Sequence, residues 1–277
     1  TYAINSPDFR KKIESHITGT TRLRISGKKL KDLQIPLPPL ETQKRIAAIL
    51  DKADALRRKD QELLQKYDDL AQAIFMDMFG DPVKNEKGWE VKKLAEVCDV
   101  RDGTHDSPKY VANGYPLVTS KNLRDGTINL SDTNFISEND YLEINKRSRV
   151  GKGDILMPMI GTIGNPVIVN SDPNFAIKNV CLIKKSEILN PNFLVALLSS
   201  SIMDRLIEKV SRGGTQKFLS LGDIRNLKVP IPPEILQTRF DAFQVKLAKA
   251  KSNIFILQSE SLFQSLLQKA FTGELVP

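Results

Sequence analysis

Two related proline-rich segments reveal how this chain is organised, DLQIPLPP at residues 32–39 and NLKVPIPP at residues 226–233. A glycine-threonine pair precedes each phrase, at Gly19-Thr20 and at Gly214-Thr215. A glutamine follows each phrase at the same distance, Gln43 in the first copy and Gln237 in the second. Matches that keep their order over such a distance indicate an internal duplication. The chain therefore holds less than two copies of a unit of roughly 190 residues, with two matching tails around one complete middle.

The residues after each Pro-Pro pair predict a long helix. Residues 40–79 contain neither proline nor glycine, and their apolar residues recur at alternating steps of three and four, with Asp60 in one place. The expected seam positions are Ile46, Ile49, Ala53, Leu56, Leu63, Tyr67, Leu70 and Ile74. This spacing is typical of a coiled coil, and the same register recurs from Phe240 onward. About 40 residues at ~1.5 Å each predict a rod of about 60 Å.

Two helices with one seam register are expected to pack on each other. Residues 40–81 are assigned to the first long helix and residues 234–277 to the second. A twofold axis that relates the two copies and crosses the rod would make the helices antiparallel. A simple helical hairpin that covers a core is the alternative.

Residues 82–233 predict a mainly β domain closed by one helix. Short apolar runs, such as those at 115–120 and 166–170, alternate with turn segments rich in Gly, Asp, Asn and Pro. Asn190-Pro191 supplies a cap and a first-turn proline for the closing helix. A similar helix start at Ser6-Pro7 assigns residues 1–39 to the C-terminal remnant of an equivalent domain. The fold class is α+β, a mainly β domain with a closing helix, flanked by two long helices in an antiparallel coiled coil.

Composition favours a globular chain with an acidic partner. Lys+Arg 41 against Asp+Glu 33 leaves a net charge of +8, which suits nucleic acid. No run of residues reaches the ~18 to 20 apolar residues of a membrane span, so we expect a soluble, cytoplasmic protein with no membrane partner. Two cysteines and two histidines are too few for a clustered metal site, and we expect neither a metal nor a cofactor.

Catalytic motifs are nearly absent. The segments DPNF at 172–175 and NPNF at 190–193 approach the Asp/Asn-Pro-Pro-aromatic loop of adenine methyltransferases, but both lack the second proline. Phosphate-binding loops, zinc-protease helices and nucleophile elbows have no match in the sequence. The prediction is a protein that is not an enzyme.

Basic and amide side chains gather in the predicted turns of the middle domain. Lysine and arginine neutralise DNA phosphates, while Arg, Asn and Gln form paired hydrogen bonds to base edges. His105, in the turn DGTHDSP, could act as a base or as a hydrogen-bond reader of DNA. The candidate DNA-binding residues are Arg101, Thr104, His105, Lys109, Lys121, Asn122, Arg124, Lys178, Asn179, Arg212, Thr215, Gln216 and Lys217. For each of them alone, a solvated surface residue is the alternative.

Four segments in this order carry a resemblance to a known family. They are GWEVKKLAEVCDVRDGTHDSPKY at 88–110, YPLVTSKNLRDG at 115–126, GDILMPMIGTIGNPVIV at 153–169 and GGTQKFLSLGDIRNLKVPIPP at 213–233, followed by the second long helix. Together with the duplication, they resemble the specificity subunit of type I restriction-modification systems. The resemblance runs essentially from end to end.

The resemblance implies two target-recognition domains, joined by two long antiparallel helices, that each read one half of a split site on double-stranded DNA. It also implies partners: modification subunits that methylate adenine, and restriction subunits that translocate and cut DNA. By this analogy the subunit has no active site of its own. A rod of fixed length would then set the spacer between the half-sites.

This sequence departs from the family pattern because only one recognition domain is complete. A truncated subunit could form a homodimer to restore two readers, or it could be a fragment or a remnant, and the sequence leaves these open. Two other classes of function also stay open, a DNA-binding protein that works alone and a coiled-coil scaffold for other proteins.

Overall fold

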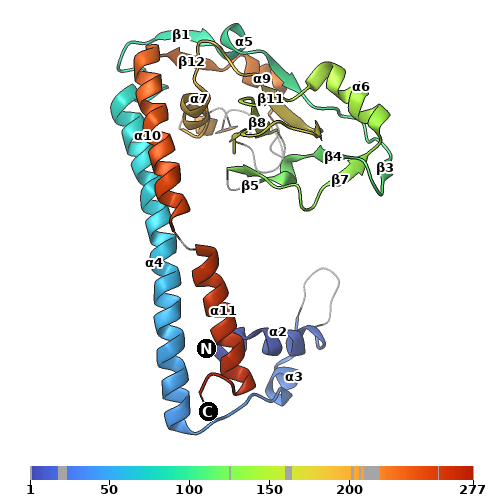
Figure 1. The fold of residues 1–277 in the computed structure, drawn as a ribbon, viewed down its shortest axis with the longest axis vertical. Helices are drawn as coiled ribbons and strands as arrows, with labels where there is room; N and C mark the ends of the chain where they lie inside the picture. The colour runs from blue at the N-terminus through green and yellow to red at the C-terminus, as the bar shows by residue number, and fades with distance from the viewer. Residues whose placement is uncertain are drawn as a thin grey trace. The chain divides into compact units, whose positions relative to one another are not determined.

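The chain folds into two compact units, residues 1–68 with 248–277, and residues 69–247 (Figure 1). The structure is a computed structural model, and it describes residues 2–17, 24–124, 126–159, 164–200, 203–205, 207–208, 219–254 and 256–276. We call the two units the first and the second unit. The long helix α4 (Leu40–Phe79) begins in the first unit and ends in the second.

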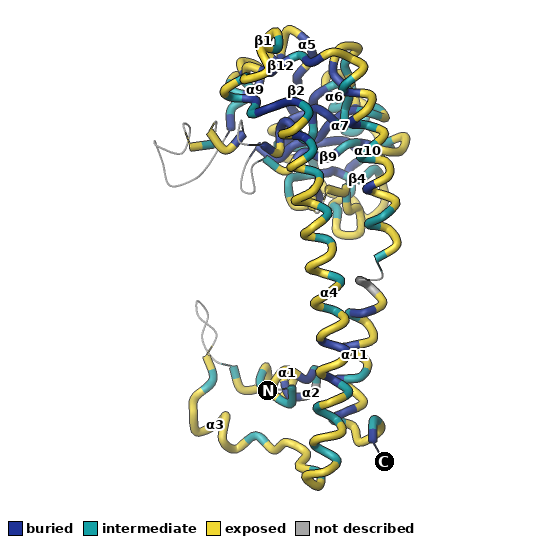
Figure 2. The backbone as a smooth tube through the Cα atoms, turned by 90° about the vertical axis from the view of Figure 1, so that its left-hand side faces the viewer, coloured by how far each residue is buried: buried dark blue, intermediate teal, exposed yellow. Residues whose placement is uncertain are grey.

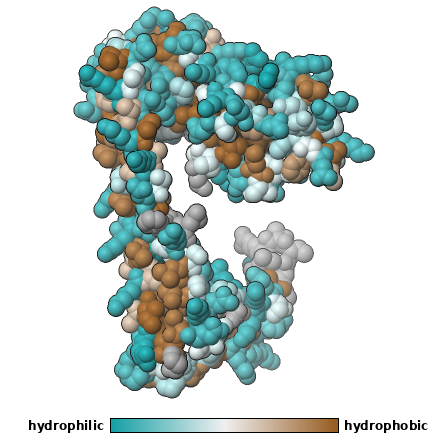
Figure 3. Space-filling view, viewed as in Figure 1, coloured by the Kyte–Doolittle hydropathy of each residue, from teal (hydrophilic) through white to brown (hydrophobic). Residues whose placement is uncertain are grey.

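The first unit is helical in its described part. Its elements are α1 (Tyr2–Asn5), α2 (Pro7–Glu14), α3 (Gly27–Asp32), the first part of α4, and α11 (Ile256–Thr272). Helix α2 begins as the sequence predicts, with Ser6 as its cap and Pro7 in its first turn. Apolar residues gather over α11 in the space-filling view (Figure 3). The core of this unit consists of Leu50 and Ala53 from α4 with Phe263, Leu267 and Ala270 from α11.

Helices α4 and α11 run antiparallel in the first unit. Leu50 packs with Leu267 of α11, Arg57 pairs with Glu260 of α11 at 3.3 Å, and Asp68 pairs with Lys251, which precedes α11 in the chain. The residue number therefore rises along α4 while it falls along its partner. This pairing confirms the antiparallel direction that the sequence predicts.

The buried face of α4 does not follow the predicted seam throughout. At alternate positions of the seam, the more buried residue is the one that follows the predicted residue. Leu56, Leu63 and Leu70 are 47%, 40% and 43% exposed, whereas Leu50 is fully buried and Leu64 is half-buried. The two apolar pairs Ile49-Leu50 and Leu63-Leu64 fit a step of three or of four equally well. Leu50 packs against α11, and Leu64 is more buried than Leu63. The prediction of Leu56, Leu63 and Leu70 as seam residues was therefore wrong.

The second unit combines short strands with helices. Its strands are β1 (Glu90–Lys93), β2 (Val100–Asp102), β3 (Tyr110–Val111), β4 (Tyr115–Val118), β5 (Leu123–Arg124), β6 (Thr127–Ile128), β7 (Asn134–Ile136), β8 (Ile155–Pro158), β9 (Val167–Ile168), β10 (Ala176–Ile177), β11 (Val180–Ile183) and β12 (Lys228–Ile231). Its helical elements are the end of α4, α5 (Leu94–Val97), the 3-10 turn η1 (Ser120–Asn122), α6 (Glu138–Ser148), α7 (Pro191–Leu198), α9 (Leu221–Arg225) and most of α10 (Glu234–Ser252).

Two four-stranded sheets form the middle of the second unit, in the orders β2-β11-β8-β9 and β10-β4-β7-β3. Strand β11 pairs antiparallel with both β2 and β8, and β10 pairs parallel with β4. Strands β8 and β11 are buried along their whole length. Figure 2 shows this burial as dark blue tube in the middle of the unit. The α+β class with a mainly β domain is confirmed.

Four phenylalanine rings anchor the helices to the sheets within the second unit. Phe75 and Phe79 of α4 meet Phe240 of α10 at centroid distances of 5.7 and 5.5 Å, and Phe193 of α7 meets Phe79 at 4.7 Å. All four rings are at most 2% exposed. Aromatic pairs in tilted or edge contact add to the stabilisation from apolar burial.

Both repeats begin their long helix with the same hydrogen bond. Gln43 Nε2 donates to the carbonyl oxygen of Pro38 at 2.7 Å, and Gln237 Nε2 donates to that of Pro232 at 2.9 Å. Gln237 is 2% exposed, and its Oε1 also accepts from the backbone N–H of Asn190 at 2.8 Å. Each glutamine thus supplies a hydrogen-bond donor to a proline carbonyl oxygen that lies just before the helix start.

Two predicted helices are shorter than expected. The closing helix α7 ends at Leu198, where Ser199 and Ser200 follow. The second long helix consists of α10 and α11, and Asn253 forms a turn between them. Serine and asparagine side chains compete with helical backbone hydrogen bonds, so these sites favour helix ends. Among the described helices, none has the length and apolar character to cross a membrane.

Replacement of Phe240 by alanine should destabilise the second unit. The change removes a fully buried ring that contacts the rings of Phe75 and Phe79, which costs about 3 to 5 kcal/mol. Denaturant unfolding of Phe240→Ala and of the control Val245→Ala, which lies on the same helix at 60% exposure, measures the difference. A loss equal to that of Val245→Ala would contradict the role of the four rings.

Replacement of Asp54 by asparagine should weaken the first unit in a pH-dependent way. Hydrogen bonds from Arg57 hold the pKa of Asp54 below its usual value, and charged hydrogen bonds of this kind contribute about 2 kcal/mol. A carboxyl group whose pKa is lower in the folded chain than in the unfolded chain stabilises the fold at pH values above the unfolded pKa. This contribution disappears as the pH falls through the folded pKa.

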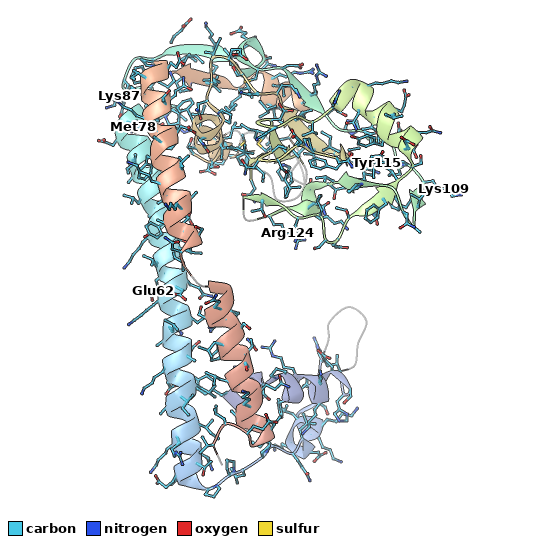
Figure 4. The ribbon with its side chains drawn as sticks, in the orientation of Figure 1. Glu62, Met78, Lys87, Lys109, Tyr115 and Arg124 are labelled. Atoms are coloured by element: carbon cyan, nitrogen blue, oxygen red, sulfur yellow. The ribbon has the colours of Figure 1, made fainter. Side chains whose placement is uncertain are left out.

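Thermal unfolding of the wild type and Asp54→Asn should therefore differ at pH 7 and converge in acid. Glu62→Gln, an exposed change on the same helix (Figure 4), is the control and should match the wild type at both pH values. A difference that stays constant down to the acid range would contradict the ion pair.

Candidate nucleic-acid interface

The candidate interface lies where the two four-stranded sheets of the second unit meet. After β2 the chain passes Gly103 and reaches Thr104, which pairs with Lys178 in an isolated parallel bridge. A Cβ atom at Gly103 would lie 2.4 Å from the carbonyl oxygen of Ile177, so only glycine allows the two segments to approach this closely. The two segments that carry Arg101, Thr104, His105, Lys178 and Asn179 are therefore held together by backbone contacts.

Asn179 makes the turn that takes the chain from one sheet to the other. It stands between β10 and β11 with φ at +53°, in the left-handed region that asparagine tolerates better than most residues. Its backbone N–H donates to the carbonyl oxygen of Thr104 at 3.1 Å. The turn thus presents Lys178 and Asn179 next to the loop that follows β2.

A chain of side-chain hydrogen bonds runs along this junction. The carboxylate of Asp102 is 8% exposed and accepts from His105 Nε2 at 2.7 Å and from the guanidinium of Arg147. His105 Nδ1 lies 2.9 Å from Asn179 Oδ1. A buried carboxylate needs such donors, because burial without them is strongly unfavourable. Strand β2, helix α6 and the turn before β11 therefore meet in one polar network.

The network favours the charged form of His105. The hydrogen bond with Asp102, and next the one with Asn179, raise the pKa of His105 above its usual value, while burial and the positive charge of Arg147 act in the opposite direction. Because the ring remains 58% exposed, its charge is also available to a partner of opposite sign.

Basic groups surround the network. Arg101 donates to the carboxylate of Asp99 and to the carbonyl oxygen of Arg147, and Lys178 donates to the hydroxyl of Ser107. Of the predicted residues, the structure brings together Arg101, Thr104, His105, Lys178 and Asn179. Phosphate contacts and base-edge contacts could both be made from such a cluster.

Other candidates lie apart from this cluster. Lys109 and Arg124 are exposed at the periphery of the unit (Figure 4), and Lys121 pairs with Asp132 at 3.5 Å. Asn122 is 3% exposed, and its amide donates to the carbonyl oxygens of Asn129 and Asp132. Its side chain holds the loop together and is not accessible to DNA in this structure. Arg212, Thr215, Gln216 and Lys217 lie outside the described residues.

The sequence reasoning missed Arg147. This residue belongs to the last turn of α6, where a basic side chain is ordinary because it complements the helix dipole. Only the packing of α6 against β2 brings its guanidinium to Asp102. No local pattern in the sequence could have indicated this contact.

The thiols of the second unit show no reactive character. Burial raises the pKa of Cys98 to about 11 and that of Cys181 to about 12, so both are protonated at neutral pH and poor nucleophiles. Within the described ranges, no three His, Cys, Asp or Glu residues lie close enough to hold a metal ion.

Relatives with curated functions match nearly the whole chain. The specificity subunit of the type I restriction enzyme EcoBI of Escherichia coli is 28% identical over 97% of this chain and 64% of its own length. The MjaIX specificity subunit of Methanocaldococcus jannaschii is 28% identical over 93% of this chain and 64% of its own length. The chain thus spans 64% of the length of each of these relatives, which is less than two thirds.

Solved structures share the fold. An HsdS subunit from Thermoanaerobacter tengcongensis superposes with a TM-score of 0.51 over 99% of this chain and 69% of the other, at 21% identity. The S subunit of a type I system from M. genitalium gives 0.59 over 98% and 71%, at 19% identity. The family model for the type I restriction modification DNA specificity domain matches residues 8–66 and 86–256. Because these two matches cover most of the chain, with one on each copy of the repeat, the chain belongs to the family of type I restriction-modification DNA specificity domains.

Proposed function

We propose that this chain is a sequence-specific DNA recognition subunit of a type I restriction-modification complex, which directs adenine methylation and DNA cleavage by partner subunits. The observation that carries the proposal is the double family match on a duplicated chain. The polar network at the junction of the two sheets supplies the reading chemistry. In this role the chain has no catalysis of its own, and the reacting groups belong to the modification and restriction subunits.

The second unit is the proposed reader of one half-site. Arg101 and Lys178 suit phosphate contacts, whereas Asn179 suits a hydrogen bond to a base edge. Lys109 and Arg124, at the periphery of the unit, and Lys121 extend the basic surface of the same unit. The net charge of +8 favours association with DNA and makes it sensitive to salt. Residues 1–39 stay a proposed remnant of a second reader, and a homodimer and a cytoplasmic location stay predictions.

Co-expression with modification subunits followed by sequencing of methylated DNA tests this proposal. The expected result is a new split adenine motif that depends on this chain. The triple change Arg101→Ala, Lys178→Ala, Asn179→Gly should abolish methylation at that motif, while the control Lys249→Ala, on α10, should leave it intact. An unaltered methylome in an assembled complex would favour a coiled-coil scaffold, and specific DNA binding without partners would favour a protein that works alone.

The length of the paired helices is the proposed determinant of the spacer between half-sites. One heptad inserted into α4, with a matching heptad in α11, keeps the seam register and adds about 10 Å. This length corresponds to about three base pairs at ~3.4 Å each. Methylome sequencing should therefore show both half-sites unchanged and a spacer longer by about three base pairs. A longer rod with an unchanged spacer would contradict the idea.

A further inference from the structure

The ring of His105 is held between two oxygen atoms. Nε2 lies 2.7 Å from Asp102 Oδ2, and Nδ1 lies 2.9 Å from Asn179 Oδ1. A neutral imidazole has one N–H donor and one lone pair, so it cannot donate to two oxygens. With the amide in this orientation, both contacts are hydrogen bonds only if His105 carries a proton on each nitrogen.

Loss of the Nδ1 proton of His105 would change the orientation of the Asn179 amide. An ionised carboxylate only accepts, so Asp102 keeps the proton on Nε2 and deprotonation exposes a lone pair on Nδ1. That lone pair repels Asn179 Oδ1, and a hydrogen bond is restored only if the amide turns over and donates from Nδ2. The charge of His105 therefore decides which end of the Asn179 amide faces away from the ring.

The backbone around Asn179 is fixed, so the side-chain amide can respond only by turning over. The bridge between Thr104 and Lys178 fixes the segment, and the left-handed φ of Asn179 belongs to the turn between two sheets. Across the described chain, Nδ2 of Asn179 has no hydrogen-bond acceptor, and this atom is not fully buried. The amide nitrogen is thus open to an external acceptor.

The groups that face the ring come from several elements. Asp102 of β2 stabilises the charge, and Arg147 of α6 opposes it. Lys178 in the turn is bound to Ser107, Asp106 follows in the same loop, and Cys181 of β11 is a protonated thiol behind Asp102. The carboxylate in direct contact outweighs the others, because its hydrogen bond is the largest influence on the ring.

We propose that Asp102 and protonated His105 are positioning residues that fix the amide of Asn179 with Nδ2 free to donate to an acceptor on a DNA base. Such acceptors in the major groove are purine N7, guanine O6 and thymine O4. This inference rests on the proposed DNA recognition function. Recognition of the half-site is therefore linked to a proton on His105.

The linkage has a definite sign. The pKa of His105 is raised in the free chain, and a base that binds only the protonated arrangement raises it further. Specific affinity is then full at low pH and falls as pH rises through the pKa of His105. Affinity for unrelated DNA includes the same phosphate contacts, so the ratio of the two affinities isolates base recognition.

The experiment measures this ratio in the complex with modification subunits. The probes are a duplex that carries the methylated motif and a duplex with the half-site scrambled, at constant salt and at pH values from about 5.5 to 8.5, which bracket the ordinary range of histidine. We expect the preference for the motif to fall about tenfold across this range, as one hydrogen bond to a charged network is lost.

Three variants make the test specific. In His105→Gln the preference should no longer change with pH, and in Asn179→Asp, which tolerates the same backbone, it should be low at every pH. His16→Gln removes the other of the two histidines, an exposed residue of the first unit, and should behave as the wild type. Two results would overturn the inference and leave the proposed function standing. One is specific binding that does not depend on pH, and the other is a pH dependence in His105→Gln equal to that of the wild type.

Absence of specific binding at every pH overturns the proposed function, and the inference with it. A second measurement does not depend on DNA or on a change to any residue of the network. Histidine signals in an NMR titration of the free chain, assigned with His16→Gln, should give a pKa for His105 above the ordinary value of 6.5. A pKa at or below that value would show that the ring is not held between two oxygens.

Discussion

The contact of four phenylalanine rings in the second unit is the interaction on which the rest of that unit depends. Phe75 and Phe79 lie at the end of a helix of 40 residues, Phe240 lies in the first part of α10, and Phe193 belongs to the helix that closes the sheets. Three separate parts of the chain therefore share one dry core. Rings of this size remove large apolar areas from water, so the helices and the sheets are stabilised as one body.

The second constraint is the junction between the two sheets. Gly103 allows two segments to approach, and Asn179 turns the chain from β10 into β11. Because backbone contacts hold these segments, the polar side chains beside them need little further ordering when a partner binds. Asp102, buried under His105, connects this rigid junction to the exposed surface. The proposed recognition site thus combines a rigid backbone with one side chain whose charge depends on pH.

Part of the candidate site could be predicted from the sequence. Arg101, Thr104 and His105 come from one predicted turn, and Lys178 with Asn179 from another, because turn residues and basic side chains are visible locally. Their proximity could not be predicted, since it depends on which strands pair across some 75 residues, as Thr104 and Lys178 do. Local patterns also do not reveal burial, so Asn122 was grouped with exposed residues and Arg147 was missed.

The two proline-rich phrases have nearly the same residues but different backbone structure. The duplication, the long helices after each Pro-Pro pair and the matching glutamines Gln43 and Gln237 could be read from the sequence. The hydrogen bond that each glutamine makes at the helix start is seen only in the structure. The phrase at 226–233 forms β12, since Glu90–Lys93 is present to pair with it. The related phrase at 32–39 has no assigned strand after α3, and Ile35 and Leu37 are 47% and 80% exposed. A strand needs a partner for its backbone hydrogen bonds, so nearly the same residues become a strand only where the fold supplies one.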